Sequence, residues 1–548
     1  MNTQINEIIL EILHKRGITG DRDITEFLSP KPLKTYDPFL MKGMKEGVSL
    51  IVESIKNNKK ICIYGDYDAD GVTSVSIIKS IIDTVSDRAD YYIPGRFDEG
   101  YGLNMDAIRT IYEQGTDLII TVDCGITSRE EVKYAKELGM NIIITDHHNI
   151  GEHIPDCIVI DPKQEDCKYP FKNLAGCGVA FKLAQGIQRE LKLPKKVIND
   201  LLDIAAIGTI GDVMPLVDEN RTIVKYGINR IRSNKRPGLK YLIEKSGKDI
   251  SYITAEDISF GIVPNLNAAG RMGDAGVAVR FFTETDIDKT KILADNLIEL
   301  NDKRKEIQER DYLRCVSVYE QRYSEFLFPM IVLDGAHEGV AGIVAGKMKD
   351  YCGKPVAILT EKDEYYKGTS RSNDYIDIHE ILSKDSDLFE KFGGHKGACG
   401  FTIKKEYLEH LVKDIESEMA EHRLCESDRQ NGQNDFTLEI SGEKVNDKLL
   451  DELELLEPFG EGNERPVFFI RNTRLVYMSR MGADGNHMRF TVETERGNRI
   501  GCVYFNIPEE KAKDMDKGIS VNIAGTLAFN RWNGRKDIQL TVSDISFS

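Results

Sequence analysis

Short runs of apolar, β-forming residues recur in the first 161 residues, and each run leads into an acidic residue. Helical patterns separate the runs, and this alternation is typical of buried parallel strands in a doubly wound α/β sheet. Ligands of such sheets bind at the carboxyl ends of the strands. The sequence therefore predicts that several carboxylates and two imidazoles meet at one edge of one sheet. The runs cover residues 61–64, 118–122, 142–145 and 158–160, and they lead into Asp66, Asp68 and Asp70, into Asp123, into Asp146, His147 and His148, and into Asp161.

Such a cluster of acids requires cations, because like charges repel one another and are costly to bury. Asp68 and Asp70 lie two residues apart, so in an extended segment both side chains would point the same way. Mg²⁺ and Mn²⁺ prefer carboxylate oxygens, and Mn²⁺ also accepts imidazole. The pattern therefore predicts two Mn²⁺ or Mg²⁺ ions, which can activate water and stabilise both oxygens of a phosphoryl transfer. Asp161, directly before Pro162, is expected to be a turn residue instead.

Composition limits the class of protein. The 548 residues are too many for one core. A net charge of −17 argues against a protein that coats nucleic acid by bulk charge, but it leaves nucleic acid open as a substrate. The ten cysteines form no CxxC pair, which favours buried thiols in a reducing compartment. We see neither a signal peptide nor an apolar run of the roughly 20 residues that would cross a membrane, so we expect a cytoplasmic enzyme.

The order of patterns predicts several units. Residues 277–328 contain neither Gly nor Pro, and about thirty helical residues would span on the order of 45 Å. Near the end of the chain, Asn533-Gly534 stands between apolar runs, which is a strong hairpin signal in a small β-barrel. A polar linker is expected at residues 426–435. The predicted units are an N-terminal wing (1–45), a catalytic α/β unit (46–230), a helical connector (231–327), a second α/β unit (328–425) and the barrel (436–548).

Four segments carry a resemblance to a known superfamily. Residues 146–148 read Asp-His-His, and residues 65–71, 121–125 and 208–216 are similar to the accompanying motifs of the DHH phosphoesterase superfamily. Within it the chain most closely resembles the RecJ family of single-strand-specific 5′→3′ DNA exonucleases, and the resemblance covers nearly all residues. It implies a DHH doubly wound sheet joined by the long helix to a DHHA1 α/β domain, followed by an OB-fold barrel.

The resemblance also implies roles for the acidic cluster. Asp123 would bridge the two ions, and His148 would lie close to the scissile phosphate. Asp66 and Asp146 would support the ligands. Several members of the superfamily have a His where this chain has Tyr64, so one metal site could carry an extra water or bind its ion more weakly. The implied metal ligands are Asp68, Asp70, Asp123, His147 and Asp212.

Other residues are implied to contact the substrate. Residues 367–372 would form the substrate-binding turn of the DHHA1 domain, because hydroxyls, amides and one Arg suit a terminal phosphate. For Arg304, an ordinary surface role is as consistent as phosphate contact. For Trp532, packing on the barrel rim is as consistent as stacking on a base. The predicted substrate-binding residues are Arg271, Arg304, His337, Thr369, Ser370, Arg371, Gly394, His395 and Trp532.

The expected function is removal of nucleotides from the 5′ end of single-stranded DNA by two-metal hydrolysis, in DNA repair and recombination. By analogy with the family, the expected partners are a single-stranded DNA-binding protein and a RecQ-type helicase, and we expect a monomer without membrane contact. One alternative is a DHH-DHHA1 phosphodiesterase for short oligonucleotides or cyclic dinucleotides. Another is a scaffold that binds single strands without catalysis, although such a protein would not need to keep all the ligand positions.

Overall fold

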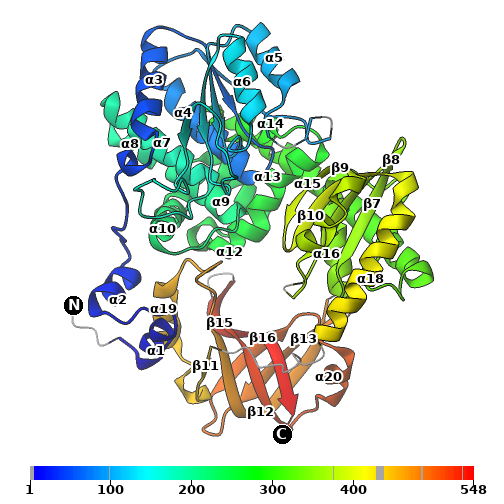
Figure 1. Cartoon of the computed structure of the whole chain (residues 1–548). Helices are drawn as coiled ribbons and strands as arrows, with labels where there is room; N and C mark the ends of the chain where they lie inside the picture. Colours follow the sequence, from blue (N-terminus) through cyan, green and yellow to red (C-terminus); the bar gives the residue numbers. More distant parts are fainter. Residues whose placement is uncertain are drawn as a thin grey trace.

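The computed structural model of the protein describes residues 5–97, 99–100, 102–373, 375–426, 437–482, 485–532 and 535–547. The side chains of residues 422–426 and of Trp532 are outside this description. Figure 1 shows a parallel sheet flanked by helices at the top, a second α/β unit beside it, and a barrel below them. Within the described residues, no helix combines the length and the apolar character that a membrane span needs.

The first unit is a five-stranded, fully parallel sheet with the strand order β2-β1-β3-β4-β5. Alternate residues of its strands face opposite layers: Ile61 and Ile63 join one large core, whereas Cys62 and Tyr64 join another. The predicted doubly wound sheet is therefore confirmed. The strands are β1 (Ile61–Tyr64), β2 (Ala89–Tyr92), β3 (Leu118–Val122), β4 (Asn141–Thr145) and β5 (Ile158–Ile160).

Helices cover both faces of this sheet, as Figure 1 shows. The larger core lies under α3, α4, α7 and α9, and the smaller core lies under α5 and α6. Since β2 and β3 lie on opposite sides of β1, the chain reverses its winding between β1 and β3, where such folds bind ligands. The helices are α3 (Met44–Lys56), α4 (Ala69–Asp83), α5 (Met105–Glu113), α6 (Arg129–Glu137), α7 (Gly176–Glu190), α8 (Lys195–Asn199) and α9 (Leu202–Gly211).

A helical region follows and contains the predicted long helix, α15 (Ile287–Arg322). Its 36 residues correspond to about 54 Å at 1.5 Å per residue. It packs against α11, α13 and α14 of this region and against α16 of the second α/β unit, so it joins the two units. The other elements are α10 (Asp218–Arg232), α11 (Pro237–Lys245), α12 (Ala255–Asp257), the π-helix Ile258–Ile262, α13 (Val263–Met272) and α14 (Gly276–Thr283).

The second unit has a mixed sheet with the strand order β6-β7-β8-β10-β9. The prediction of a turn at residues 367–372 is wrong, because β8 runs through residue 371 as the central strand, paired on both sides. Gly368 makes this possible, since a Cβ there would lie 2.2 Å from the Phe401 ring. The elements are β6 (Met330–Val332), α16 (Glu338–Cys352), β7 (Val356–Lys362), β8 (Tyr365–Arg371), α17 (Ile378–Ser383), β9 (Phe389–His395), β10 (Ala398–Lys404) and α18 (Leu408–Glu426).

The C-terminal unit is a closed barrel, because β12 pairs with both β13 and β15. Around the barrel the order is β12-β13-β14-β16-β15, and β11 (Leu438–Glu439) extends it in parallel with β12. The predicted hairpin is confirmed by the pairing of β15 with β16, although its Asn533-Gly534 tip lies outside the described residues. The other elements are α19 (Asp447–Leu453), β12 (Val467–Met481), β13 (His487–Glu493), β14 (Arg499–Tyr504), α20 (Glu509–Asp514), β15 (Ser520–Trp532) and β16 (Arg535–Phe547).

The two ends of the chain share one core. Helix α1 (Glu7–Lys15) buries Ile9 and Ile12 among the apolar residues of α19 and the barrel, and α2 (Asp21–Leu28) adds Ile24. The Lys15 amino group donates to the carbonyl of Thr437. The segment predicted as an N-terminal wing therefore begins with two helices that pack as part of the C-terminal unit, before the chain crosses to the parallel sheet (Figure 1).

Candidate active site

The end of β1 delivers two acids in different ways. Asp68 is the N-cap of α4, and its carboxylate accepts hydrogen bonds from the backbone N–H groups of Asp70 and Gly71. Asp70 lies in the first turn of the helix. The prediction that an extended segment aims both side chains the same way is therefore wrong, because the helix begins at Ala69. A helix N-terminus favours negative charge, and this stabilises both carboxylates.

A second helix fixes the direction of Asp70. Its two carboxylate oxygens accept hydrogen bonds from the N–H groups of Gly176 and Cys177, at 2.7 and 2.8 Å. Both donors belong to the first turn of α7, whose N–H groups have no partner within the helix. Asp70 therefore lies between the N-termini of two helices, which hold a buried carboxylate without a cationic side chain.

Asp123 directly follows β3 with a φ of +60°, a strained backbone conformation for a residue other than glycine. Helix α7 approaches it closely, since a Cβ at Gly176 would lie 2.6 Å from the Asp123 Oδ1. The residue is 3% exposed. Strain of this kind persists where the surrounding packing imposes it, and it is typical of functional sites.

His147 lies at the centre of the cluster. Its Nε2 is 3.1 Å from Asp123 Oδ1, 3.6 Å from Asp212 Oδ2 and 3.8 Å from Asp70 Oδ2. Asp212 reaches this point from a different element, as the C-cap residue of α9. Three groups of side chains each bring their ligand atoms within 4.8 Å of one another: Asp70 with His147 and Asp212, Asp66 with Asp68 and Asp123, and Asp123 with both histidines. The structure thus brings together the five predicted metal ligands, with Asp123 in two of the groups.

Without cations, the buried acids of the cluster have pKa values far from their ordinary range. Burial, followed by repulsion from neighbouring carboxylates, raises the pKa of Asp66, Asp70 and Asp123 well above the ordinary range. The same causes raise the pKa of Asp212 to about 7, and burial lowers the pKa of His147 to about 3. A divalent ion would reverse the shifts of the carboxyl groups, because it stabilises their ionised form. It would reinforce the shift of His147, because it binds the neutral imidazole.

Asp146 orients the second histidine. Its Oδ1 lies 2.7 Å from the His148 Nδ1 and accepts the backbone N–H of His147, and its Oδ2 accepts the N–H of Ile126. Burial lowers the pKa of His148, but the hydrogen bond and charge of Asp146 outweigh it and raise the pKa to about 9. The carboxylate can only accept, so it fixes a proton on Nδ1 and turns Nε2 outward.

The donor set fits hard divalent cations. Carboxylate oxygens dominate and one imidazole joins them, which suits Mn²⁺ or Mg²⁺. Among the described residues, the buried Asp66 Oδ1 and Asp212 Oδ2 have no hydrogen-bond partner, and such atoms are costly unless a ligand satisfies them. Tyr64 does not substitute for a metal-binding His: its hydroxyl donates to the carbonyl of Gly102 at 2.9 Å, and its ring stacks on Tyr92.

Arginines gather beside the cluster, where α13 meets the second α/β unit. Burial, followed by the positive charges of Arg96, Arg304 and Arg371, lowers the pKa of Arg271 to about 10. Arg96 lies 4.7 Å above the Tyr67 ring. Sequence reasoning missed Arg96 as a candidate site residue, although the resemblance, which covers nearly all residues, includes the segment 96–104. We define the arginine group as Arg96, Arg271, Arg304 and Arg371.

The hydrogen bonds of three members of this group go to neutral oxygens. Arg271 donates to the carbonyl of Gly339, and Arg371 donates to the carbonyl of Ser370. Arg304 donates to the side-chain amides of Asn301 and Gln308. These bonds orient the guanidinium groups without neutralising them, so the group can receive phosphates.

The other predicted substrate-binding residues differ in burial and in the side of the sheet that they face. Strand alternation turns Ser370 inward, where its hydroxyl bonds to the backbone N–H and C=O of Cys399, while Thr369 lies on the opposite face of β8. Thr369 and Gly394 line a cavity of about 700 Å³ that also includes Arg96. His395 is exposed at the end of β9.

His337 and Trp532 are the last two predicted substrate-binding residues. His337 is the N-cap of α16, with its Nδ1 accepting the N–H of Gly339 and its ring against Phe97. It therefore adjoins both the arginine group and the cavity. The side chain of Trp532 lies outside the described residues, so its role stays a prediction.

Comparisons with known proteins agree along the whole chain. Residues 60–209 match the DHH family N-terminal domain, residues 327–421 the DHHA1 domain, and residues 436–544 the RecJ OB domain. The single-stranded-DNA-specific exonuclease RecJ of Bacillus subtilis (strain 168) is 39% identical over 547 residues, which cover 99% of this chain and 68% of the relative. The namesake from Salmonella typhimurium is 31% identical over 564 residues, which cover 98% and 95%. The chain belongs to the RecJ family.

Solved RecJ structures share the architecture. The crystal structure of RecJ from Thermus thermophilus in complex with Mn²⁺ matches with a TM-score of 0.82 at 28% identity, over 99% of this chain and 76% of that chain. The complex of the same protein with Mg²⁺ matches with a TM-score of 0.76 at 27% identity, over 99% and 75%. These are the two ions that the donor set favours, so the prediction of Mn²⁺ or Mg²⁺ is confirmed for this RecJ-family fold.

Proposed function

We propose that this chain is a single-stranded-DNA-specific exonuclease that removes nucleotides from the 5′ end and acts in DNA repair and recombination. The observation that carries the proposal is the joint placement of two features: the acid and imidazole cluster at the winding reversal of the sheet, and the arginine group beside it. The RecJ relatives named above are single-stranded-DNA-specific exonucleases, and this chain has their three family domains.

When bound at this site, two divalent ions would supply the hydrolytic chemistry, which is the activation of a water and the stabilisation of charge on the attacking and leaving oxygens. Asp68, Asp70, Asp123, His147 and Asp212 would hold these ions. The N–H groups at the start of α7 keep Asp70 oriented. The His148 ring, held by Asp146, presents its Nε2 to the phosphate and donates a proton or a hydrogen bond to it.

The arginine group would bind the terminal phosphates of the strand. Arg271 and Arg371 come from different units, so a phosphate between them would be held across the junction of the DHH and DHHA1 domains. We infer that this junction admits one strand and excludes a duplex. Efficient digestion of blunt duplex DNA would contradict this part of the proposal.

We also propose the cellular setting. The chain would act as a monomer in the cytoplasm, together with a single-stranded DNA-binding protein and a RecQ-type helicase that supplies single strands. Every cysteine whose side chain is described is a free thiol, which is typical of a reducing compartment.

Digestion of single strands labelled at either end tests the function. With Mn²⁺ or Mg²⁺ we expect the 5′ label to be released first as a short product, while the 3′ label stays on long fragments. Chelator should abolish the release of the 5′ label and leave the strands at full length. Release that begins at the 3′ end, or activity that persists in chelator, would overturn the proposal.

A further inference from the structure

Residues 458–463 form a short loop that belongs to the C-terminal unit, and we call it the docking loop. Phe459 is 4% exposed in the core that the barrel shares with α1 and α19. Gly460 and Asn463 close the loop by exchanging backbone hydrogen bonds of 3.1 and 3.0 Å. The loop is therefore a compact turn attached to the barrel.

The docking loop contacts the segment that follows the metal ligand Asp212. The N–H of Leu216 donates to the carbonyl of Glu461 at 2.7 Å. A Cβ at Gly460 would lie 2.7 Å from the Leu216 Cδ1, and one at Gly462 would lie 3.2 Å from the Pro215 Cβ. The two glycines thus allow an approach that any side chain would obstruct. The C-terminal unit touches the chain within four residues of a metal ligand.

Asp212 depends on that segment for its position. It ends α9, and the next residue, Val213, has a φ of +54°. The buried Asp212 Oδ2 has no hydrogen-bond partner among the described residues. Two backbone N–H groups hold the carboxylate of Asp70. The position of Asp212 is instead set by the backbone segments that precede and follow it. One of these anchors is Leu216, which the docking loop holds.

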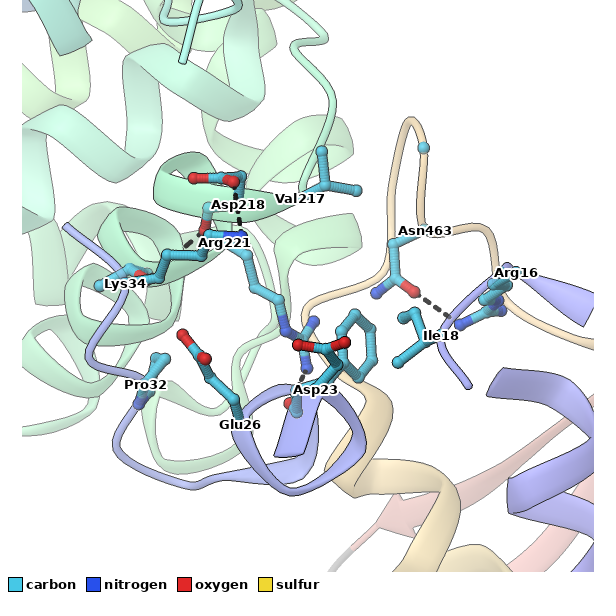
Figure 2. Close-up of a pocket in the computed structure, with 14 residues that line it drawn as sticks. Arg16, Ile18, Asp23, Glu26, Pro32, Lys34, Val217, Asp218, Arg221 and Asn463 are labelled. Atoms are coloured by element: carbon cyan, nitrogen blue, oxygen red, sulfur yellow. Dashed lines mark hydrogen bonds and ion pairs between the residues drawn. The ribbon is translucent and has the colours of Figure 1, made fainter. Parts of the chain in front are cut away.

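Buried polar contacts hold the docking loop itself, and Figure 2 shows where they meet. Arg221 of α10 is 4% exposed, donates to the carbonyl of Leu456 at 2.9 Å and stacks on Phe27 at 3.9 Å. Asn463 donates to the carbonyls of Leu456 and Pro458 and accepts from Arg16 at 2.6 Å. Three segments that are far apart in sequence therefore fix one turn.

We propose that the docking loop is a positioning element for Asp212, through which the barrel raises the metal affinity of the DHH domain. This inference rests on the proposed function, because it assigns Asp212 to the metal site. It gives the C-terminal unit a role at the metal site of the DHH domain. Outer contacts that orient a metal ligand affect affinity and activity even though they do not touch the ion.

The test uses glycine variants in the full-length chain. Gly460→Ala and Gly462→Ala add a methyl group against Leu216 and Pro215. Gly497→Ala is the matched control for Gly462→Ala, because Gly497 has a similar φ (+84° against +67°) in the same unit but no atom within 4 Å of its Cβ position. Far-ultraviolet circular dichroism and Trp532 fluorescence would establish that each variant is folded. Mn²⁺ binding would be measured by electron paramagnetic resonance of the free ion.

We expect Gly460→Ala and Gly462→Ala to raise the dissociation constant for Mn²⁺ by about 3- to 10-fold, a smaller effect than loss of a direct ligand contact. Their kcat should fall while KM for single strands stays the same, and Gly497→Ala should resemble the unmodified chain. Adding Leu216→Val to Gly460→Ala removes the atom that the new methyl group meets, and it should restore Mn²⁺ affinity.

Unchanged Mn²⁺ affinity in both folded glycine variants would overturn the inference and leave the loop as a packing contact. Weaker binding in Gly497→Ala to the same extent would also overturn it. Mn²⁺ binding is measured without DNA, so these outcomes are separate from the test of exonuclease activity. If the unmodified chain bound no Mn²⁺, the proposed function itself would fail.

Discussion

Asp123 combines three properties that rarely coincide in one residue: a buried carboxylate, a left-handed backbone and membership of two ligand groups. Each property costs free energy in the metal-free chain. The apolar run 118–122 followed by an acid predicted the position of this residue, but its strain and its close contact with Gly176 became visible only in three dimensions.

Asp123→Ala should lower the exonuclease rate by at least about 10²-fold, because even the loss of an outer partner of a metal ligand costs 10- to 100-fold. The fold should survive, since removing one buried like charge relieves repulsion. Digestion of labelled single strands and thermal unfolding in chelator would measure the two effects. Asp156→Ala, which removes an acid with a fully exposed side chain, is the control and should change neither. Retained activity in Asp123→Ala would refute its bridging role.

Asp161 shows how an acid of the same pattern can have another role. Its Oδ1 accepts the N–H of Lys163 in a turn, as predicted, while its buried Oδ2 has no hydrogen-bond partner among the described residues. Burial raises the pKa of Asp161 to about 7. The folded protein therefore binds this proton more tightly than the unfolded chain does, whose carboxyl has a pKa of about 4.

The consequence is a stability that falls as pH rises from about 4 to about 7, because the unfolded chain releases the proton first. Asp161→Asn keeps the Oδ1 acceptor and has no charge to bury. It should match the original chain near pH 4 and be more stable by about 4 kcal/mol at pH 8, which corresponds to about three pKa units. Urea unfolding in chelator at the two pH values would measure this. A stability difference independent of pH would contradict the explanation.

At the scale of elements, β8 illustrates what side-chain alternation adds to a motif. The resemblance marked Thr369, Ser370 and Arg371 together, but neighbouring residues of a strand face opposite sides. Ser370 consequently bonds to the backbone of Cys399 in the interior, while Arg371 remains beside Arg96. A strand cannot offer three consecutive side chains to one ligand, whereas the predicted turn could have done so.

This arrangement predicts different effects for two adjacent substitutions. Arg371→Ala should raise KM for single strands with a 5′-phosphate by about 10-fold or more, since a hydrogen bond to a charged group contributes about 1.5–3 kcal/mol. Its unfolding free energy should change little. Ser370→Ala should instead lower the unfolding free energy by about 1–3 kcal/mol, because it leaves buried backbone groups of Cys399 without their partner. Steady-state kinetics and urea unfolding would separate the two, and a reversed pattern would refute the assignment.

At the scale of the whole molecule, the chain closes on itself. Helices α1 and α2 complete the core of the C-terminal unit, and the docking loop then returns from that unit to the DHH domain. The DHH domain is therefore linked to the C-terminal unit twice. The chain enters the DHH domain from α1 and α2, which pack on the barrel, and the docking loop contacts that domain again near the other end of the sequence. The stability of the barrel should therefore depend on the first thirty residues of the chain.

Ile12→Ala should therefore destabilise a barrel that begins more than 400 residues later. Ile12 is fully buried among barrel residues, and truncation of a buried Ile costs about 2–5 kcal/mol. Trp532, the only tryptophan, belongs to β15, so its fluorescence is a probe placed in the barrel. Glu11→Ala on the same helix is the control, because Glu11 is exposed. Equal fluorescence midpoints for the two variants would show that α1 does not stabilise the barrel.

The apolar runs, the acids that end them and the Asp-His-His motif sufficed to predict the parallel sheet and a Mn²⁺ or Mg²⁺ cluster, because strand ends in such sheets meet at one edge. The stretch without Gly or Pro and the Asn-Gly hairpin signal predicted the long helix and the barrel. Periodicity and strand-end positions are local properties that the linear order of residues preserves. Contacts between distant segments are not local, and their partners cannot be paired from one sequence.

The details that required the tertiary structure are contacts between distant segments. The α7 N–H groups that orient Asp70, the four arginines from separate segments, and the return of the docking loop to Leu216 all join residues many positions apart. None has a spacing signature, since each depends on how complete elements pack. Packing also reversed two local expectations, at Asp70 and at Ser370, because helix and strand geometry set where those side chains point.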